Sequence, residues 1–351
     1  MRRGGQARGL RRARHEPMGQ PGRPSDDPGS GRRDPSLSGR CPPGSVHGGV
    51  SRCLGRARGY RFGGVRGTPA RSRILREPHW QPCAGGPRMA QISDRPEDAI
   101  EAIFGRRKAL IGMIHCPAFP GAPRYRGAPR EEILSACLRD AERLIAGGMH
   151  GLLIENHGDI PFSRPEDIGH ETAAFMAVVA DRISREFGVP MGINVLANAP
   201  IPAFAVAAAS GASFIRVNQW ANAYVANEGF MEGRAAQALC YRASLRAEGI
   251  RVFADSHVKH GSHAIVADRS VTELTRDLAF FDADAVIVTG QRTGDGASPD
   301  EIETVRDATH LPVLVGSGVT PSNVAAILER ADAVIVGSSL KEGGVWWNPV
   351  E

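Results

Sequence analysis

The densest group of reactive side chains in the sequence lies between residues 255 and 263. The segment reads Asp-Ser-His-Val-Lys-His-Gly-Ser-His, so it contains one carboxylate, three imidazoles and one amine. In an extended backbone, Asp255 and His257 point to the same side. Imidazoles exchange protons near neutral pH, and a lysine amine can act as a base or form an imine. We therefore expect Asp255, His257 and Lys259 to be catalytic, with a solvated polar loop as the alternative.

Glu155 is the fourth catalytic candidate. It ends an apolar run, residues 151–155, and Asn156 and His157 follow it. With the histidines of the 255–263 segment it could bind a divalent metal, but the His-Glu-x-x-His spacing of zinc enzymes is absent. The sequence therefore assigns no metal ligands and no certain cofactor, and it leaves a divalent metal open.

Two glycine-rich turns near the C-terminus have the composition of a phosphate site. They read Val-Gly-Ser-Gly-Val at 315–319 and Val-Gly-Ser-Ser-Leu at 336–340. Backbone N–H groups of such turns can hold a phosphate dianion, because glycine lets the ligand approach the backbone closely. The chain has 40 arginines but only three lysines, so Lys341 beside the second turn is a candidate for contacting phosphate. We expect phosphate to be bound by Gly316, Ser317, Gly318, Gly337, Ser338, Ser339 and Lys341; tight turns without a ligand are the alternative.

Five further polar residues are expected to contact the substrate. They lie in or at the ends of apolar runs, where amide, hydroxyl and imidazole groups suit a polyhydroxylated ligand such as a sugar. They are His115, Asn156, Asn194, Asn218 and Thr289. An asparagine at such a position can instead satisfy the backbone of a loop.

Apolar β-branched runs alternate with helical patterns from residue 109 onward. The predicted strands are 109–115, 151–155, 191–196, 213–218, 251–256, 284–289, 312–316 and 333–337. The predicted helices are 130–146, 168–187, 200–209, 232–247, 270–281, 299–308 and 321–330. This alternation of strands and helices predicts an α/β fold, a (β/α)₈ TIM barrel. A doubly wound open sheet is the competitor, but no Gly-x-Gly-x-x-Gly turn follows the first strand.

Several of the predicted links from strand to helix are long. They are residues 116–129, 157–167, 219–231 and 257–269. In a barrel all of these links lie at the C-terminal ends of the strands, where ligand sites are built. The reactive residues named above therefore belong to one face of the predicted fold.

The first 88 residues differ from the rest in composition. They contain 19 arginines, no lysine and five acidic residues, whereas the rest of the chain has 24 basic and 33 acidic residues. Dense glycine and proline without hydrophobic periodicity predict a disordered extension. An RNA-binding arm, a transit peptide and a true start at Met89 are the open interpretations, and the acidic remainder argues against nucleic acid as a partner. We expect three parts: the 1–88 extension, a helical segment at 89–107 and a barrel at 108–351.

Cysteine usage and hydropathy suggest a compartment. Six cysteines form no Cys-x-x-Cys pair, and no run of about 18 apolar residues or signal-peptide pattern is present. We therefore expect free thiols, no membrane span and a cytoplasmic location.

The ordered motifs resemble those of the BtpA/SgcQ family. The resemblance rests on residues 111–123, 154–162 and 255–260, on Thr289-Gly290 and Thr293-Gly294, and on both glycine-rich turns. It implies a barrel of the ribulose-phosphate-binding type. The family has a named role in photosystem I accumulation, and some of its members lie in sugar-metabolism settings. The chain stops where the last barrel helix would run, so we expect that helix to be truncated and the exposed strands to be covered by a helix at 95–105 or by a partner subunit, as in a homo-oligomer.

Two functions follow as expectations. The first is an enzyme acting on a small phosphorylated metabolite, such as a phosphosugar isomerase, aldolase or lyase. The second is a non-catalytic factor for photosystem I biogenesis that uses the barrel as a protein-binding scaffold. A fold by itself does not choose between them.

Overall fold

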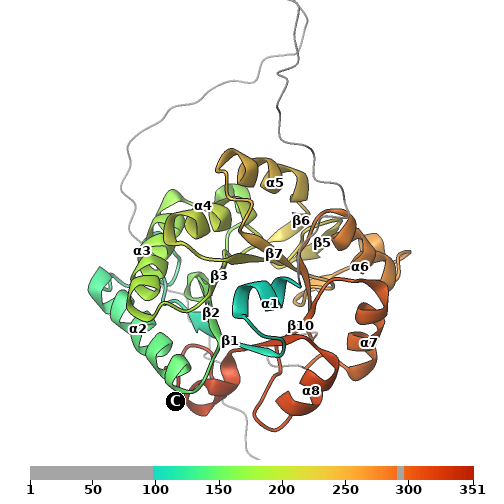
Figure 1. Cartoon of the computed structure of the whole chain (residues 1–351). Coiled ribbons are helices and arrows are strands. Elements are labelled where there is room, and N and C mark those ends of the chain that lie inside the picture. Colours follow the sequence, from blue (N-terminus) through green and yellow to red (C-terminus); the bar gives the residue numbers. More distant parts are fainter. Residues whose placement is uncertain (1–97, 291–295) are drawn as a thin grey trace, which may run out of the picture. The chain divides into compact units, whose positions relative to one another are not determined.

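A computed structural model describes residues 98–290 and 296–351 of the chain. These residues form a closed barrel of parallel strands surrounded by helices (Figure 1). Around the barrel the strand order is β1-β11-β10-β9-β7-β4-β3-β2. The strands are β1 Ala109–His115, β2 Gly151–Glu155, β3 Met191–Asn194, β4 Phe214–Val217, β7 Arg251–Asp255, β9 Ala285–Val288, β10 Val313–Gly316 and β11 Ala333–Val336. The predicted barrel is confirmed, and the predicted 1–88 boundary lies outside the described residues.

A helix follows each of the first seven barrel strands in chain order. These helices are α2 Arg130–Ala146, α3 His170–Phe187, α4 Pro200–Ser210, α5 Ala235–Ser244, α6 Val271–Phe280, α7 Pro299–Ala308 and α8 Val324–Arg330. The serine before α7 caps it as its sequence predicts, because Ser298 Oγ accepts a hydrogen bond from Glu301 N. Helix α8 begins three residues later than predicted. Asn323 there accepts from Thr320 N and donates to Gly318 O, which makes a turn of residues 320–323.

A short helix closes the N-terminal end of the barrel. Helix α1, Ala99–Phe104, lies at the centre of the view in Figure 1 and is capped by the Asp98 carboxylate. Its Ile100 is fully buried against side chains from inside the barrel. These side chains include Ile111, Leu153, Phe214, Phe253, Ile287, Leu314 and Ile335. The predicted N-terminal helix therefore exists, but it plugs the base of the barrel instead of replacing the missing outer helix.

The last barrel strand is followed by a non-regular segment that occupies the place of an eighth helix. Two single turns of 3₁₀ helix, Ser338–Leu340 and Glu342–Gly344, follow β11. The buried ammonium of Lys341 contacts Asp140 of α2, and Val350 N donates to the same carboxylate at 3.0 Å. Residues 338–351, which we call the C-terminal segment, are thereby fixed to α2. No α-helix follows β11 in residues 337–351.

Two of the predicted long loops contain regular structure. Strands β5 Ala223–Ala226 and β6 Gly229–Glu232 form a hairpin, and β8 Gly261–Ser262 pairs with β5 to complete a three-stranded antiparallel sheet. We call this the mouth sheet, because its residues line the cavity described below. The sequence analysis missed it, since a two-stranded hairpin is barely stable alone and its third strand comes from a distant loop. No helix among residues 98–290 and 296–351 has the length and apolar character needed to span a membrane.

Candidate active site

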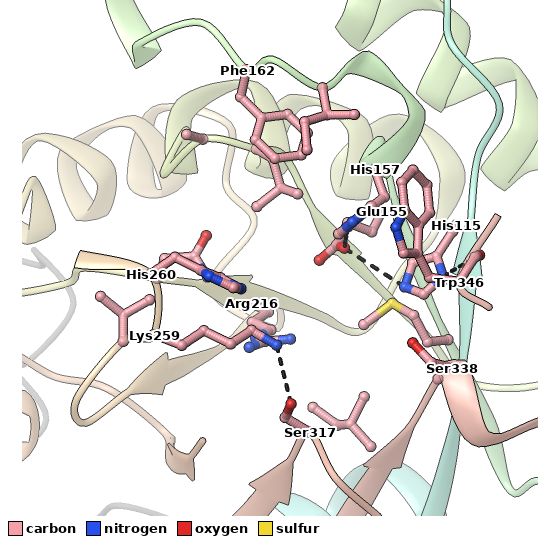
Figure 2. Close-up of a pocket in the computed structure, with 18 of the residues that line it drawn as sticks. His115, Glu155, His157, Phe162, Arg216, Lys259, His260, Ser317, Ser338 and Trp346 are labelled. Carbon is pink, nitrogen blue, oxygen red and sulfur yellow. Dashed lines mark hydrogen bonds and ion pairs between the residues drawn. The ribbon is translucent and has the colours of Figure 1, made fainter. Parts of the chain in front are cut away.

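A cavity of about 580 Å³ lies at the C-terminal ends of the barrel strands. Figure 2 shows that residues from opposite sides of the barrel face it. His115 and Glu155 come from β1 and β2, Arg216 from β4, and Ser317 and Ser338 from the turns after β10 and β11. The expectation that the long links share one face with the glycine turns is therefore met by this cavity.

The register of the parallel strands places three polar side chains in one row. His115 of β1 pairs with Glu155 of β2, and Glu155 pairs with Asn194 of β3. Asn194 Nδ2 donates to Glu155 Oε2 at 2.6 Å. The amide is buried and does not line the cavity. The Asn194 side chain thus orients the carboxylate, and its contact with a substrate stays a prediction.

Close packing of two loops brings His157 beside this row. A Cβ added at Gly158 would lie 2.4 Å from Ala118 N and 2.6 Å from Cys116 O, so only glycine fits between these backbones. Asp159 strengthens the contact by accepting from Phe119 N at 2.8 Å. Asn156 donates to Asp159 and bonds the backbone of residue 196, and it does not line the cavity. Asn156 therefore stabilises the loop, and its contact with a substrate stays a prediction.

Replacing Gly158 by alanine should destabilise this junction. The new methyl group meets backbone atoms that cannot rotate away, and overpacking of this kind costs about 1–3 kcal/mol in the free energy of unfolding. Urea denaturation measures the change. Gly249→Ala is the control, because no atom lies within 4 Å of the added Cβ there, and it should change stability by less than about 0.5 kcal/mol. Equal losses in the two variants would contradict the packing argument.

Glu155 lies between two imidazoles. His157 Nδ1 is 2.7 Å from Glu155 Oε1, and His115 Nε2 is 3.9 Å from the same oxygen. Burial by itself would raise the pKa of Glu155, but the hydrogen bond from His157, the electrostatic interaction with that ring and the charge of Arg216 lower it below its usual range. The carboxylate is therefore ionised at neutral pH.

His115 is held as a neutral ring with a defined tautomer. Burial lowers its pKa to about 3, more than the neighbouring Glu155 raises it. Its Nδ1 lies 3.1 Å from the carbonyl oxygen of Trp346, which can only accept a hydrogen bond. Nδ1 therefore carries the proton and Nε2 presents its lone pair to the Glu155 carboxylate. The Trp346 ring also packs on His157, with ring centroids 4.1 Å apart, and sequence analysis did not single it out.

His115, Glu155 and His157 are also the residues that could hold a metal. One donor atom from each lies within 4.8 Å of the others. The histidines expected to join Glu155 as ligands, those of residues 255–263, do not belong to this group.

Arg216 supplies a fixed positive charge to the cavity. It forms a two-pronged ion pair with Asp255, with Nε–Oδ1 and Nη2–Oδ2 distances of 3.0 and 3.1 Å. Burial would lower the pKa of Arg216, but Asp255 raises it. Asp255 is 3% exposed, does not line the cavity and holds Arg216 in place, and its catalytic role stays a prediction. Arg216 was missed, although a charged residue inside an apolar strand was a usable signal.

Asn218 lies next to this pair and faces the cavity. Its Nδ2 donates to Asp255 Oδ2 at 3.1 Å, while its buried Oδ1 has no hydrogen-bond partner in the described part of the chain. An unsatisfied buried oxygen is costly unless a ligand donates to it. Asn218 therefore stays a predicted substrate ligand.

In the segment after β7, some side chains line the cavity and others pack against each other inside the loop. Lys259 lines the cavity, and its Nζ donates to Ser317 Oγ at 3.3 Å. His257 instead stacks on His263 with ring centroids 3.9 Å apart, and burial followed by the charge of His263 lowers its pKa. The His257 carbonyl accepts from Thr289 Oγ1, and neither side chain lines the cavity. The structure therefore does not place these two side chains with the cavity residues, and the catalytic role of His257 and the substrate contact of Thr289 stay predictions.

The two glycine-rich turns form one wall of the cavity. Ser317, Gly318, Gly337, Ser338 and Ser339 line it. Ser317 and Gly318 have positive φ angles of 104° and 64°, a conformation that points successive N–H groups to one side. Ser339 Oγ donates to Val319 O at 2.6 Å and joins the turns.

Two predicted phosphate ligands lie elsewhere. Gly316 is a buried residue of β10 beneath the turn and does not line the cavity. Lys341 is buried in its ion pair with Asp140 and is also absent from the cavity wall. Asp140 holds the lysine against α2, and the phosphate contacts of Gly316 and Lys341 stay predictions. Thr293 and Gly294 lie outside the described residues.

A model of the BtpA family matches residues 106–351. The chain belongs to the BtpA family. The photosystem I biogenesis protein BtpA of Synechocystis is 31% identical over 242 residues, which cover 69% of this chain and 83% of that protein. An uncharacterized protein of Pyrococcus horikoshii is 38% identical over 243 residues, covering 69% and 91% of the two chains. A Caenorhabditis elegans protein described as uncharacterized and mitochondrial is 38% identical over 250 residues, covering 70% and 89%.

Solved structures also resemble this BtpA-family barrel. A tryptophan synthase α-subunit from Pyrococcus furiosus aligns with a TM-score of 0.45 at 16% identity, over 67% of this chain and 89% of that one. The phosphoribosyl anthranilate isomerase of Thermus thermophilus aligns with a TM-score of 0.42 at 14% identity, over 68% and 92%. The fold assignment itself stands on the strand order of this chain.

Proposed function

We propose that this BtpA-family barrel binds a small phosphorylated sugar or nucleoside-type metabolite and acts on it as an isomerase, aldolase or lyase. One observation carries the proposal. The two glycine-rich turns line the same cavity as Glu155, Arg216 and Lys259. An anion-binding wall and groups that transfer protons thus meet in one space, and a volume of about 580 Å³ suits a small metabolite.

The phosphate group would bind at the wall formed by the turns. Backbone N–H groups at Ser317, Gly318 and residues 337–339 would donate to its oxygens, as in other anion-binding nests. The Lys259 ammonium lies beside Ser317 and would add a positive charge there.

The reacting part of the ligand would face Glu155. The ionised carboxylate and its hydrogen-bonded His157 can accept a proton and return it, and Lys259 can act as acid, base or imine former. Arg216, held by Asp255, would stabilise negative charge that develops on a substrate oxygen. Asn218 Oδ1 would accept from a sugar hydroxyl.

The alternative is a non-catalytic factor in photosystem I biogenesis, the role in the name of the Synechocystis relative. In that case the barrel surface would carry the function and the cavity would need no metabolite. A homo-oligomeric state and a cytoplasmic location stay predictions under either function.

Thermal denaturation with matched sugars tests the proposal. Ribulose 5-phosphate and ribose 5-phosphate should raise the melting temperature, whereas ribulose and ribose should not. A ligand at 100 times its Kd adds about 2.7 kcal/mol to the free energy of unfolding. Ser338→Asp should abolish the shift by placing a carboxylate at the phosphate wall, and Ser135→Asp on the exposed face of α2 should leave it unchanged. Equal shifts with and without the phosphate group would overturn the phosphate site.

A further inference from the structure

We infer that His115, Glu155 and His157 form a site for one divalent transition-metal ion of the zinc or iron(II) class. Their donor atoms all lie within 4.8 Å of one another, and all three side chains line the cavity. Two imidazoles and one carboxylate are the ligands that such ions take in catalytic sites with open positions. The inference goes beyond the proposed function, because the ion would bind whether or not a phosphorylated ligand is present.

The hydrogen bonds around the cluster orient the donor atoms toward a common point. His115 Nδ1 donates to the Trp346 carbonyl, which leaves Nε2 directed at Glu155 (Figure 2). Histidines that bind metals commonly donate their other ring N–H to a carbonyl in this way. Asn194 occupies Oε2 of Glu155, so Oε1 is the oxygen that faces both rings. His115 and Glu155 are therefore each already oriented by a neighbour outside the cluster.

The charge balance of the cluster also favours a cation. Glu155 is 5% exposed, and within the described residues its ion-pair partners are the two histidines, without an arginine or lysine. The nearby cations Arg216 and Lys341 are paired with Asp255 and Asp140. A buried carboxylate without a permanent countercharge is costly, and a dication would compensate it.

Metal binding requires one change at the cluster. His157 Nδ1 and Glu155 Oε1 are 2.7 Å apart, whereas two ligand atoms bound at about 2.1 Å in a tetrahedron are separated by about 3.4 Å. The ion would take the place of the Nδ1 proton: the His157 ring would stay neutral and carry its one proton on Nε2, and the lone pairs of Nδ1 and Glu155 Oε1 would then be donated to the metal. The open positions of the ion would face the cavity and could take a substrate oxygen. If the proposed function holds, Glu155 is then a ligand and proton transfer falls to Lys259.

Metal titration of the full chain, stripped with a chelator, tests the site. Zn²⁺ measured by calorimetry and Co²⁺ measured by visible absorption should each bind one ion per cavity, with d–d bands of Co²⁺ showing imidazole ligation. His115→Gln and His157→Gln should each weaken binding at least about 100-fold and change the Co²⁺ spectrum. His257→Gln and His263→Gln are the matched controls, because this stacked pair lies outside the cluster, and both should bind as the wild type does.

Thermal denaturation of the metal-free variants shows that they are folded before the comparison is made. The site is overturned if the cluster variants bind metal like the controls, or if the folded wild-type protein retains no ion. Repeating the sugar-phosphate denaturation on metal-free protein separates the two proposals. If the melting temperature shifts with the phosphate group but the protein binds no metal, only the metal site is overturned. If the protein binds one ion but shows no such shift, only the phosphate site is overturned.

Discussion

Replacing Asp140 by asparagine is expected to lower the free energy of unfolding by about 3–5 kcal/mol, one of the two largest effects foreseen for this protein. The Lys341 side chain is 1% exposed and its ammonium contacts Asp140. Without the carboxylate, that charge stays buried and unpaired. The bond from Val350 N to residue 140 would also weaken, so the attachment of the C-terminal segment to α2 would be weakened together with the loss of the ion pair.

Urea denaturation followed by circular dichroism measures this loss. Glu273→Gln is the control, because it breaks an ion pair at the surface. The Arg276 side chain is 58% exposed and the Glu273 side chain 48%. Such pairs contribute about 0–1 kcal/mol to the free energy of unfolding. The double variant Asp140→Asn, Lys341→Met should recover part of the stability, since it removes the unpaired charge. A single variant as stable as the control would contradict the buried ion pair.

The second large effect is expected for Asp255→Asn, which leaves the Arg216 guanidinium buried with a neutral partner. The Asp255 side chain is 0% exposed and Arg216 6%, so breaking the pair should cost about 3–5 kcal/mol. Arg216 lines the cavity, and an anion entering the cavity can replace the lost carboxylate. Phosphate should therefore stabilise Asp255→Asn more than it stabilises the wild type.

Urea denaturation across a phosphate series checks this prediction. The control is Asp284→Asn, which breaks the pair between Arg251 at the start of β7 and Asp284 before β9. That pair lies at the other end of the strands, so phosphate should stabilise the control no more than the wild type. The assignment of Arg216 to the cavity fails if phosphate raises the stability of Asp255→Asn and Asp284→Asn equally.

The barrel could be predicted from sequence because its signals are local. Each strand is a short run of buried apolar residues, and glycine, proline and serine mark the helix ends beside it. Glu155, Lys259 and the two glycine turns were also predicted, since each directly follows or ends such a run. The rule that ligands bind at the C-terminal ends of parallel strands then placed them together.

Contacts between residues far apart in the chain could not be predicted from the sequence. Nothing local shows that Asp255 pairs with Arg216. Lys341 contacts Asp140, which lies 201 residues earlier. The grouping of His115 with His157 required the pairing register of β1 and β2 and the contact at Gly158. The periodicity of apolar residues indicates which side of one helix or strand is buried. It does not indicate which distant residues contact each other.

The hydrogen bond between His115 and the Trp346 carbonyl spans almost the whole barrel sequence, from the first strand to the segment after the last. During translation, the early strands can emerge and collapse while the histidine still lacks the acceptor that sets its tautomer. The tautomer of a histidine in the first barrel strand therefore depends on a residue more than 200 positions later. A chain cut before Trp346 would keep His115 but lack the carbonyl that fixes its ring proton.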